Sequence, residues 1–245
     1  MSRGRLSRGR LALVVVALLL VVVAVRRPRP AAPPQHASQP PRAAGSALRQ
    51  LEALPVLPIR PHHAGYQRDC GRGRACSFGP AWTDNTTAPG GHNGCDSRND
   101  VLRAQLVDVA YRTGSRCVVV AGTLHDPYTG SSIPFTRQHA SAVQIDHLVP
   151  LALAWDLGAY AWPQARRAAY ANDEHLVLLA VDDAANEAKG DGGPSTWMPP
   201  NPAYRATYAE RFVAVLAGYH LPLIAADKTV LAKVLKSAGQ SGKPS

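Results

Sequence analysis

The stretch VQIDHLVP, residues 143–150, decides how the chain is interpreted. Its alternating, partly β-branched apolar residues predict a short buried strand, and Pro150 marks the end of that strand. Asp146 and His147 therefore stand together at a strand end. Two interpretations fit such a pair: polar residues that reach water, or a metal ligand beside a general base. The rest of the chain has to distinguish them.

The N-terminal residues have the layout of a targeting segment. An unbroken run of Leu, Val and Ala over residues 11–25 follows a flank with four arginines, which predicts a signal peptide or N-terminal membrane anchor over residues 1–25. The run is shorter than the roughly 20 residues of a usual membrane span. Arginines directly behind it weaken the cleavage site, so both alternatives stay open. In either case we expect the body outside the cytoplasm, secreted or tethered through residues 11–25.

Residues 26–60 are rich in Pro, Ala and Arg, which predicts an extended, disordered linker. The charge follows the same division. Residues 1–60 hold ten Arg and one Glu of a chain with net charge +10, so residues 61–245 are left at +1. A near-neutral domain argues against a broad basic nucleic-acid surface. We expect one folded domain over 61–245, a size that supports a real core.

The cysteines predict disulfides. None of the four forms a C-x-x-C pair, so a zinc knuckle is disfavoured, and an even number outside the cytoplasm favours oxidation. Three pairings exist. We favour Cys70–Cys76, which closes a small loop, and Cys95–Cys117, which ties a helix to a strand.

Periodicity predicts the order of the other elements. A helix is expected over residues 97–112 and strands over 117–124, 143–149 and 175–181. A helix over 182–190 follows, with Lys189 in its last turn, and two amphipathic helices close the chain. Trp82, in a loop-rich region, is expected as a buried anchor.

Five blocks in this order resemble a known family. They are GHNGCDSRNDVL (91–102), CVVVAGTLHDPYTG (117–130), VQIDHLVPLALAW (143–155), LLAVDDAANEAKGD (178–191) and TWMPPN (196–201). The chain resembles the HNH endonucleases, and specifically the C-terminal nuclease domain of GmrSD-type restriction enzymes. The resemblance implies an α+β fold: a ββα-metal (HNH) core with additional packing helices, held here by disulfides instead of zinc-binding cysteine pairs.

The resemblance also implies roles at the strand end. Asp146 matches the metal-binding acid, Asn186 the second metal ligand and His147 the general base. The implied cofactor is one divalent metal, Mg²⁺ or alternatively Mn²⁺, whose oxygen-rich shell suits these donors. Because neighbours on an ideal strand point to opposite faces, a bulge or the strand end must re-aim Asp146 or His147.

Four further residues are candidates for the catalytic site. His175 falls near the middle position of the family motif, in a strand, although a core histidine would look the same. Lys189 either meets a phosphate or closes its helix. Arg98 and Asn99 either line the cleft or follow a helix cap at Asp96.

Together these expectations describe an exported, metal-dependent endonuclease that hydrolyses phosphodiester bonds in DNA, with RNA as a second candidate substrate, and with little sequence specificity. Two alternatives are a delivered toxin nuclease and a non-catalytic, membrane-anchored surface binding module. No small-molecule cofactor is expected.

Overall fold

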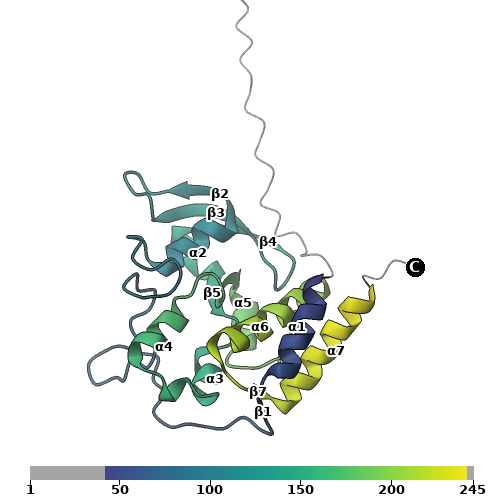
Figure 1. Ribbon diagram of the computed structural model, residues 1–245. Coiled ribbons are helices and arrows are strands. Elements are labelled where there is room, and N and C mark those ends of the chain that lie inside the picture. Colours follow the sequence, from purple (N-terminus) through teal and green to yellow (C-terminus); the bar gives the residue numbers. More distant parts are fainter. Residues whose placement is uncertain (1–41, 242–245) are drawn as a thin grey trace, which may run out of the picture. The chain divides into compact units, whose positions relative to one another are not determined.

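The computed structural model of the protein describes residues 42–241, with side chains from 45 to 240 (Figure 1). The targeting segment expected over 1–25 lies outside this part. The elements are, in chain order, α1 (Arg42–Ala53), β1 (Val56–Leu57), α2 (Ser97–Gln105), β2 (Leu106–Tyr111), β3 (Val119–His125), β4 (Ser132–Thr136), η1 (Arg137–Ala142), β5 (Val143–His147), α3 (Leu151–Asp156), η2 (Ala159–Ala161), α4 (Gln164–Ala171), β6 (Leu178–Asp182), α5 (Asp183–Lys189), η3 (Pro202–Tyr204), α6 (Arg205–Tyr219), β7 (Leu223–Ile224) and α7 (Ala225–Ser241).

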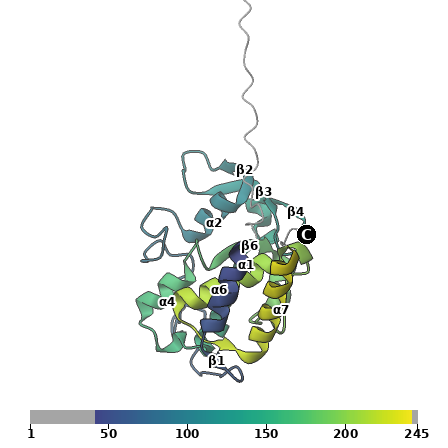
Figure 2. The same ribbon diagram turned by 45° about the vertical axis from the view of Figure 1, so that its right-hand side comes forward.

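The fold is mixed α+β, as predicted. One antiparallel sheet has the order β2-β3-β4, a second pairs β5 with β6, and β1 pairs with β7 in parallel. Helices α1, α6 and α7 pack against one another, as the two views show (Figures 1 and 2). Strand β6 is apolar and almost fully buried, because both of its faces are covered.

The linker prediction is wrong for residues 42–57, which form α1 and β1. Ala47, Leu51 and Leu54 recur at helical spacing and are buried at 5%, 0% and 8% exposure. This stripe packs against α6 and α7, whose sequences lie far downstream. Pro55 then ends the helix, and its carbonyl accepts a hydrogen bond from Leu223 N at 2.8 Å.

The helix predicted over 97–112 is two elements. Helix α2 ends at Gln105, and β2 pairs antiparallel with β3 from Leu106 onward. The β-branched Val107 and Val109 favour a strand once a partner is beside them. Asp108, with φ +53°, lies where the register shifts, which is typical of a bulge.

Both favoured disulfides are present, Cys70–Cys76 and Cys95–Cys117. The second joins Cys95, two residues before the start of α2, to Cys117, two residues before β3. Among residues 42–241, no helix is long and apolar enough to cross a membrane.

Candidate active site

The predicted strand–strand–helix unit is formed by β5, β6 and α5. The two strands pair without a register shift, from Val143 opposite Asp182 to His147 opposite Leu178. Helix α5 begins directly after β6, where the Asp182 carboxylate accepts a hydrogen bond from Ala185 N at 2.8 Å. The helix contacts both strands. This brings Lys189, in the last turn of α5, to the end of β5.

The Asp146 carboxylate is buried, and both of its oxygens accept hydrogen bonds. Lys189 Nζ donates to its Oδ1 at 2.7 Å and its Oδ2 at 2.6 Å, and Tyr128 Oη donates to Oδ2 at 2.5 Å. The third ammonium hydrogen goes to the carbonyl of His147 at 2.8 Å. An ammonium has three donors. Lys189 therefore has none left for a phosphate in this arrangement.

Burial sets the protonation preferences of this cluster. It lowers the pKa of Lys189, and the neighbouring Asp146 opposes that shift. Burial also raises the pKa of Tyr128 well above its ordinary value, and the charge of Asp146 raises it further. Tyr128 is thus a neutral hydroxyl that donates its hydrogen to the carboxylate.

His147 lies in a different environment. Its Nε2 is 2.9 Å from the carbonyl oxygen of Ala171, at the end of α4. Because a carbonyl can only accept, Nε2 carries the hydrogen and Nδ1 keeps its lone pair. The ring of Trp82 stacks on the imidazole, with centroids 6.0 Å apart and 16° between the planes.

Burial lowers the pKa of His147 to about 3; the hydrogen bond to Ala171 opposes this shift, and the charges of Arg68 and Lys189 add to it. The imidazole is therefore neutral at neutral pH. No described residue donates a hydrogen bond to its Nδ1. Nδ1 is therefore the ring nitrogen whose lone pair is free of protein partners.

The expected re-aiming of Asp146 or His147 does not occur. The ladder runs to His147 without a bulge, so consecutive side chains keep opposite faces. Asp146 meets Lys189 and Tyr128, whereas His147 meets Trp82 and Ala171. Asp146 and His147 are adjacent in the sequence, but their side chains lie in two separate environments on opposite faces of β5.

Asn186 lies on α5 one turn before Lys189 and is half-buried. Its side-chain amide has no hydrogen-bond partner among the described residues. A carboxylate and an amide are donors that Mg²⁺ accepts, at about 2.0–2.1 Å. However, the Lys189 ammonium contacts both oxygens of Asp146, and a dication would meet that positive charge. A metal shell built on Asp146 and Asn186 does not fit while Lys189 is in place. No group of three or more His, Cys, Asp or Glu side chains able to hold a metal is found within the described range.

His175 is not in a strand. It lies in the turn before β6, where the Asp173 carboxylate accepts hydrogen bonds from His175 N at 3.0 Å and Leu176 N at 2.9 Å. Because of these hydrogen bonds the turn continues past His175, and strand β6 begins only at Leu178. The His175 side chain is 70% exposed, with Glu174 at 3.8 Å. The prediction of a catalytic strand histidine is wrong in its placement.

Arg98 and Asn99 hold α2 to its neighbours. Arg98 donates to the carbonyls of Ala140 at 3.0 Å and Val143 at 2.9 Å, next to the start of β5. Asn99 is buried, and its amide bonds Asp96 Oδ2 at 2.6 Å and Val119 N at 3.0 Å. Asp96 also caps the helix, as in the second interpretation. The contacts of Arg98 and Asn99 thus serve to position β3 and β5.

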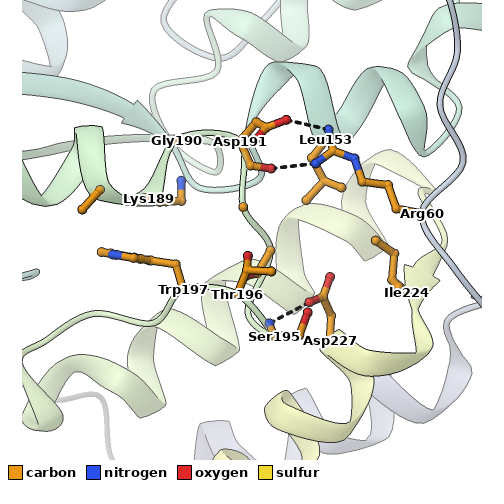
Figure 3. Close-up of a pocket in the computed structure, with 13 residues that line it drawn as sticks. Arg60, Leu153, Lys189, Gly190, Asp191, Ser195, Thr196, Trp197, Ile224 and Asp227 are labelled. Atoms are coloured by element: carbon orange, nitrogen blue, oxygen red, sulfur yellow. Dashed lines mark hydrogen bonds and ion pairs between the residues drawn. The ribbon is translucent and has the colours of Figure 1, made fainter.

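A pocket of about 400 Å³ beside the end of α5 contains Arg60, Asp191 and Asp227 but not His147 (Figure 3). Arg60 bridges Asp156 at 2.8 Å and Asp191 at 2.9 Å, and Asp227 accepts from Ser195 N at 2.7 Å. These contacts fix the loop that follows Lys189.

The sequence does not point to Tyr128 as a partner of Asp146. Tyr128 lies in HDPYTG, which has turn composition and gives no sign of a fully buried ring. Trp82 was expected as an anchor, but its stacking on His147 has no sequence signal.

These observations define an α+β domain whose buried Asp-His strand end packs on a short helix. Residues 96–234, more than half of the chain, match the family described as GmrSD restriction endonucleases, C-terminal domain. The chain belongs to this family. It is also 35% identical over 195 residues to an uncharacterized secreted protein of Arthroderma benhamiae, which covers 79% of this chain and 85% of that protein. No solved structure matches the chain significantly.

Proposed function

We propose that the protein is an exported endonuclease that hydrolyses phosphodiester bonds in DNA, with His147 as general base. The observation that carries this proposal is the state of the imidazole: neutral, fixed through Nε2, with Nδ1 free of protein partners. Membership of a restriction-endonuclease domain family supports the reaction class. Two disulfides and a relative described as secreted support export.

In the proposed reaction, Nδ1 of His147 takes a proton from water as the water oxygen bonds to phosphorus. The bond from phosphorus to O3′ breaks, and the leaving oxygen is protonated by solvent, which yields a 5′-phosphate and a 3′-hydroxyl. The low pKa keeps the base unprotonated but makes it weak. An anionic phosphate beside it would strengthen it, because a negative charge favours imidazolium.

HNH-type nucleases generally use a divalent cation, and we propose Mg²⁺ or Mn²⁺ for this protein. Such an ion would neutralise charge on the phosphate. Asp146 and Asn186 are the proposed ligands, on the condition that Lys189 withdraws from Asp146. No step above depends on the ion.

A second candidate function is a non-catalytic binding module with the nuclease fold. The engagement of Asp146 by Lys189 and Tyr128 favours it, because that carboxylate is unavailable to a metal as arranged.

Supercoiled plasmid digestion by the oxidised protein, with Mg²⁺, Mn²⁺ or EDTA, tests the first proposal. We expect metal-dependent cleavage that His147→Ala lowers by about 10²–10⁴-fold. His175→Ala is the matched control, because that exposed histidine should leave the rate nearly unchanged. Cleavage that survives in folded His147→Ala rules out the assigned base. A folded, metal-supplied protein that never cleaves DNA or RNA supports the binding module.

A further inference from the structure

Trp82 contacts the imidazole of His147 with the face of its ring. The two centroids are 6.0 Å apart and the planes differ by 16°, which corresponds to an offset stack. Each of the other three tryptophans contacts at least two tyrosine or phenylalanine rings, whereas the only ring that Trp82 contacts within the described range is that of His147. The half-buried Trp82 side chain also packs on the apolar core. The stack on His147 is thus the contact that distinguishes Trp82 from the other tryptophans.

The backbone of Trp82 adopts a left-handed conformation, with φ +59°. This conformation is unfavourable for residues with a Cβ atom, and it is rare for bulky side chains. The Trp82 carbonyl accepts a hydrogen bond from Ser97 N at 3.3 Å, at the start of α2, and this contact helps to hold the chain there. Unfavourable backbone conformations cluster at functional sites, where the surrounding structure maintains them. The conformation of Trp82 therefore supports a role beyond the filling of space.

Ser97 links the two groups that hold the imidazole. Its backbone N–H donates to the Trp82 carbonyl, and its hydroxyl donates to Asn172 Oδ1 at 2.8 Å. Asn172 directly follows Ala171, whose carbonyl accepts the hydrogen on Nε2 of His147. The Ser97 and Asn172 side chains are buried, with residue exposures of 6% and 2%. These bonds connect the stack on the face of the ring with the hydrogen bond at its edge.

The two contacts restrict different movements of the ring. The hydrogen bond to Ala171 fixes the position of Nε2, but it leaves the imidazole able to tilt about that atom. The lone pair of Nδ1 lies in the plane of the ring, so a tilt changes the direction in which the lone pair points. A flat aromatic ring against one face of the imidazole opposes the tilt. Only the two contacts together determine where Nδ1 is directed.

We propose that Trp82 is a positioning residue, which fixes the plane of the His147 imidazole and so aligns its Nδ1 lone pair with the attacking water. This inference rests on the proposed nuclease function and deepens it. A general base acts only when its lone pair is aligned with the proton that it takes, and small misplacements slow the chemical step. Substrate binding does not depend on that alignment. Loss of the stack should therefore lower kcat and leave KM nearly unchanged.

Trp82→Leu and Trp82→Phe test the inference, with Trp162→Leu as the matched control. Leucine has no flat face, whereas phenylalanine keeps one. Trp162 is also half-buried, but it contacts Tyr170 and Tyr219 instead of His147. We expect kcat for DNA cleavage to fall about 10–100-fold in Trp82→Leu, with KM within about threefold of wild type. Trp82→Phe should recover most of the rate, and Trp162→Leu should keep kcat within about threefold.

Thermal unfolding confirms that each variant folds, and Trp82→Met, which also lacks a flat face, replaces Trp82→Leu if that variant does not. Equal losses of kcat in Trp82→Leu and Trp162→Leu overturn the proposal. A folded Trp82→Leu protein with the wild-type kcat overturns it as well. A loss carried mainly by KM would assign Trp82 to substrate binding and reject the positioning role.

Nitrogen NMR of the histidine rings separates this inference from the proposed function, because the His147 signals show which ring nitrogen carries the hydrogen. We expect one tautomer, with the hydrogen on Nε2, in the wild-type protein and in Trp162→Leu, and a mixture of tautomers in Trp82→Leu. That result with an inactive wild-type protein upholds the fixed imidazole and rejects the nuclease. Unchanged His147 signals in Trp82→Leu and an inactive wild-type protein reject both. Unchanged signals with an active wild-type protein reject the role of Trp82 alone.

Discussion

Replacing Lys189 with methionine should destabilise the domain strongly, because it leaves the Asp146 carboxylate buried without its counter-ion. The ammonium is fully buried and makes three hydrogen bonds, two to Asp146 and one to the His147 carbonyl. Removing one partner of a buried pair costs about 3–5 kcal/mol. Methionine has similar length, so packing loss adds little. The free energy of unfolding should therefore fall by that amount.

Urea unfolding at neutral pH, followed by circular dichroism of the oxidised protein, measures the change. Lys228→Met is the matched control: it breaks an exposed pair with Glu52 at 3.2 Å and should cost less than about 1 kcal/mol. Adding Asp146→Asn to Lys189→Met should restore most of the loss, since the uncompensated charge is gone. If Lys189→Met lies within about 1 kcal/mol of wild type, Asp146 has another counter-ion and the reasoning fails.

Three further predictions concern stability. Leu51→Ala should cost about 2–5 kcal/mol in urea unfolding, because Leu51 is fully buried in α1; an effect near zero would mean that α1 does not pack. The folded pKa of His147 is about 3, below the usual 6.5, so the unfolded chain binds more protons between these values and stability falls as pH drops through this window. At pH 5 this loss is on the order of 2 kcal/mol, and His147→Gln should lack it in unfolding measured at pH 7.5 and 5. Cys95→Ser paired with Cys117→Ser should lower stability by about 3 kcal/mol from loop closure across a separation of 22 residues, a value that calorimetry can check.

The elements closest to the active site could be predicted from the sequence. The β5 strand end, helix α5 and both disulfides depend on local pattern or on cysteine spacing. The local sequence pattern alone does not predict helix α1, because its apolar stripe is buried only by packing on α6 and α7, far along the chain. The sequence also does not predict that α2 ends at Gln105. The apolar residues continue at helical spacing, but from Leu106 onward pairing with β3 favours a strand.

The sequence indicates which residue types form the candidate site, but it does not indicate which partners their side chains contact. Asp146 and His147 stand out by residue type and position, but the sequence cannot show that Lys189 is turned toward Asp146 rather than toward a phosphate. The burial of the Tyr128 hydroxyl against Asp146 is likewise set by tertiary contacts. Residue types are readable from one sequence, whereas the pairing of charges is not.

The separation of Asp146 and His147 has a consequence for how metal dependence should be interpreted. The face of β5 that carries Asp146 is occupied by a neutralised ion pair that fastens α5 to the strand, and the other face carries the candidate base. Since a cation already lies on the carboxylate, a metal can bind there only by displacing Lys189. Metal dependence that persists in the Asp146→Asn, Lys189→Met double variant would place the ion away from Asp146, next to the substrate phosphate. Dependence lost together with the pair would instead mean that Lys189 withdraws when the metal binds.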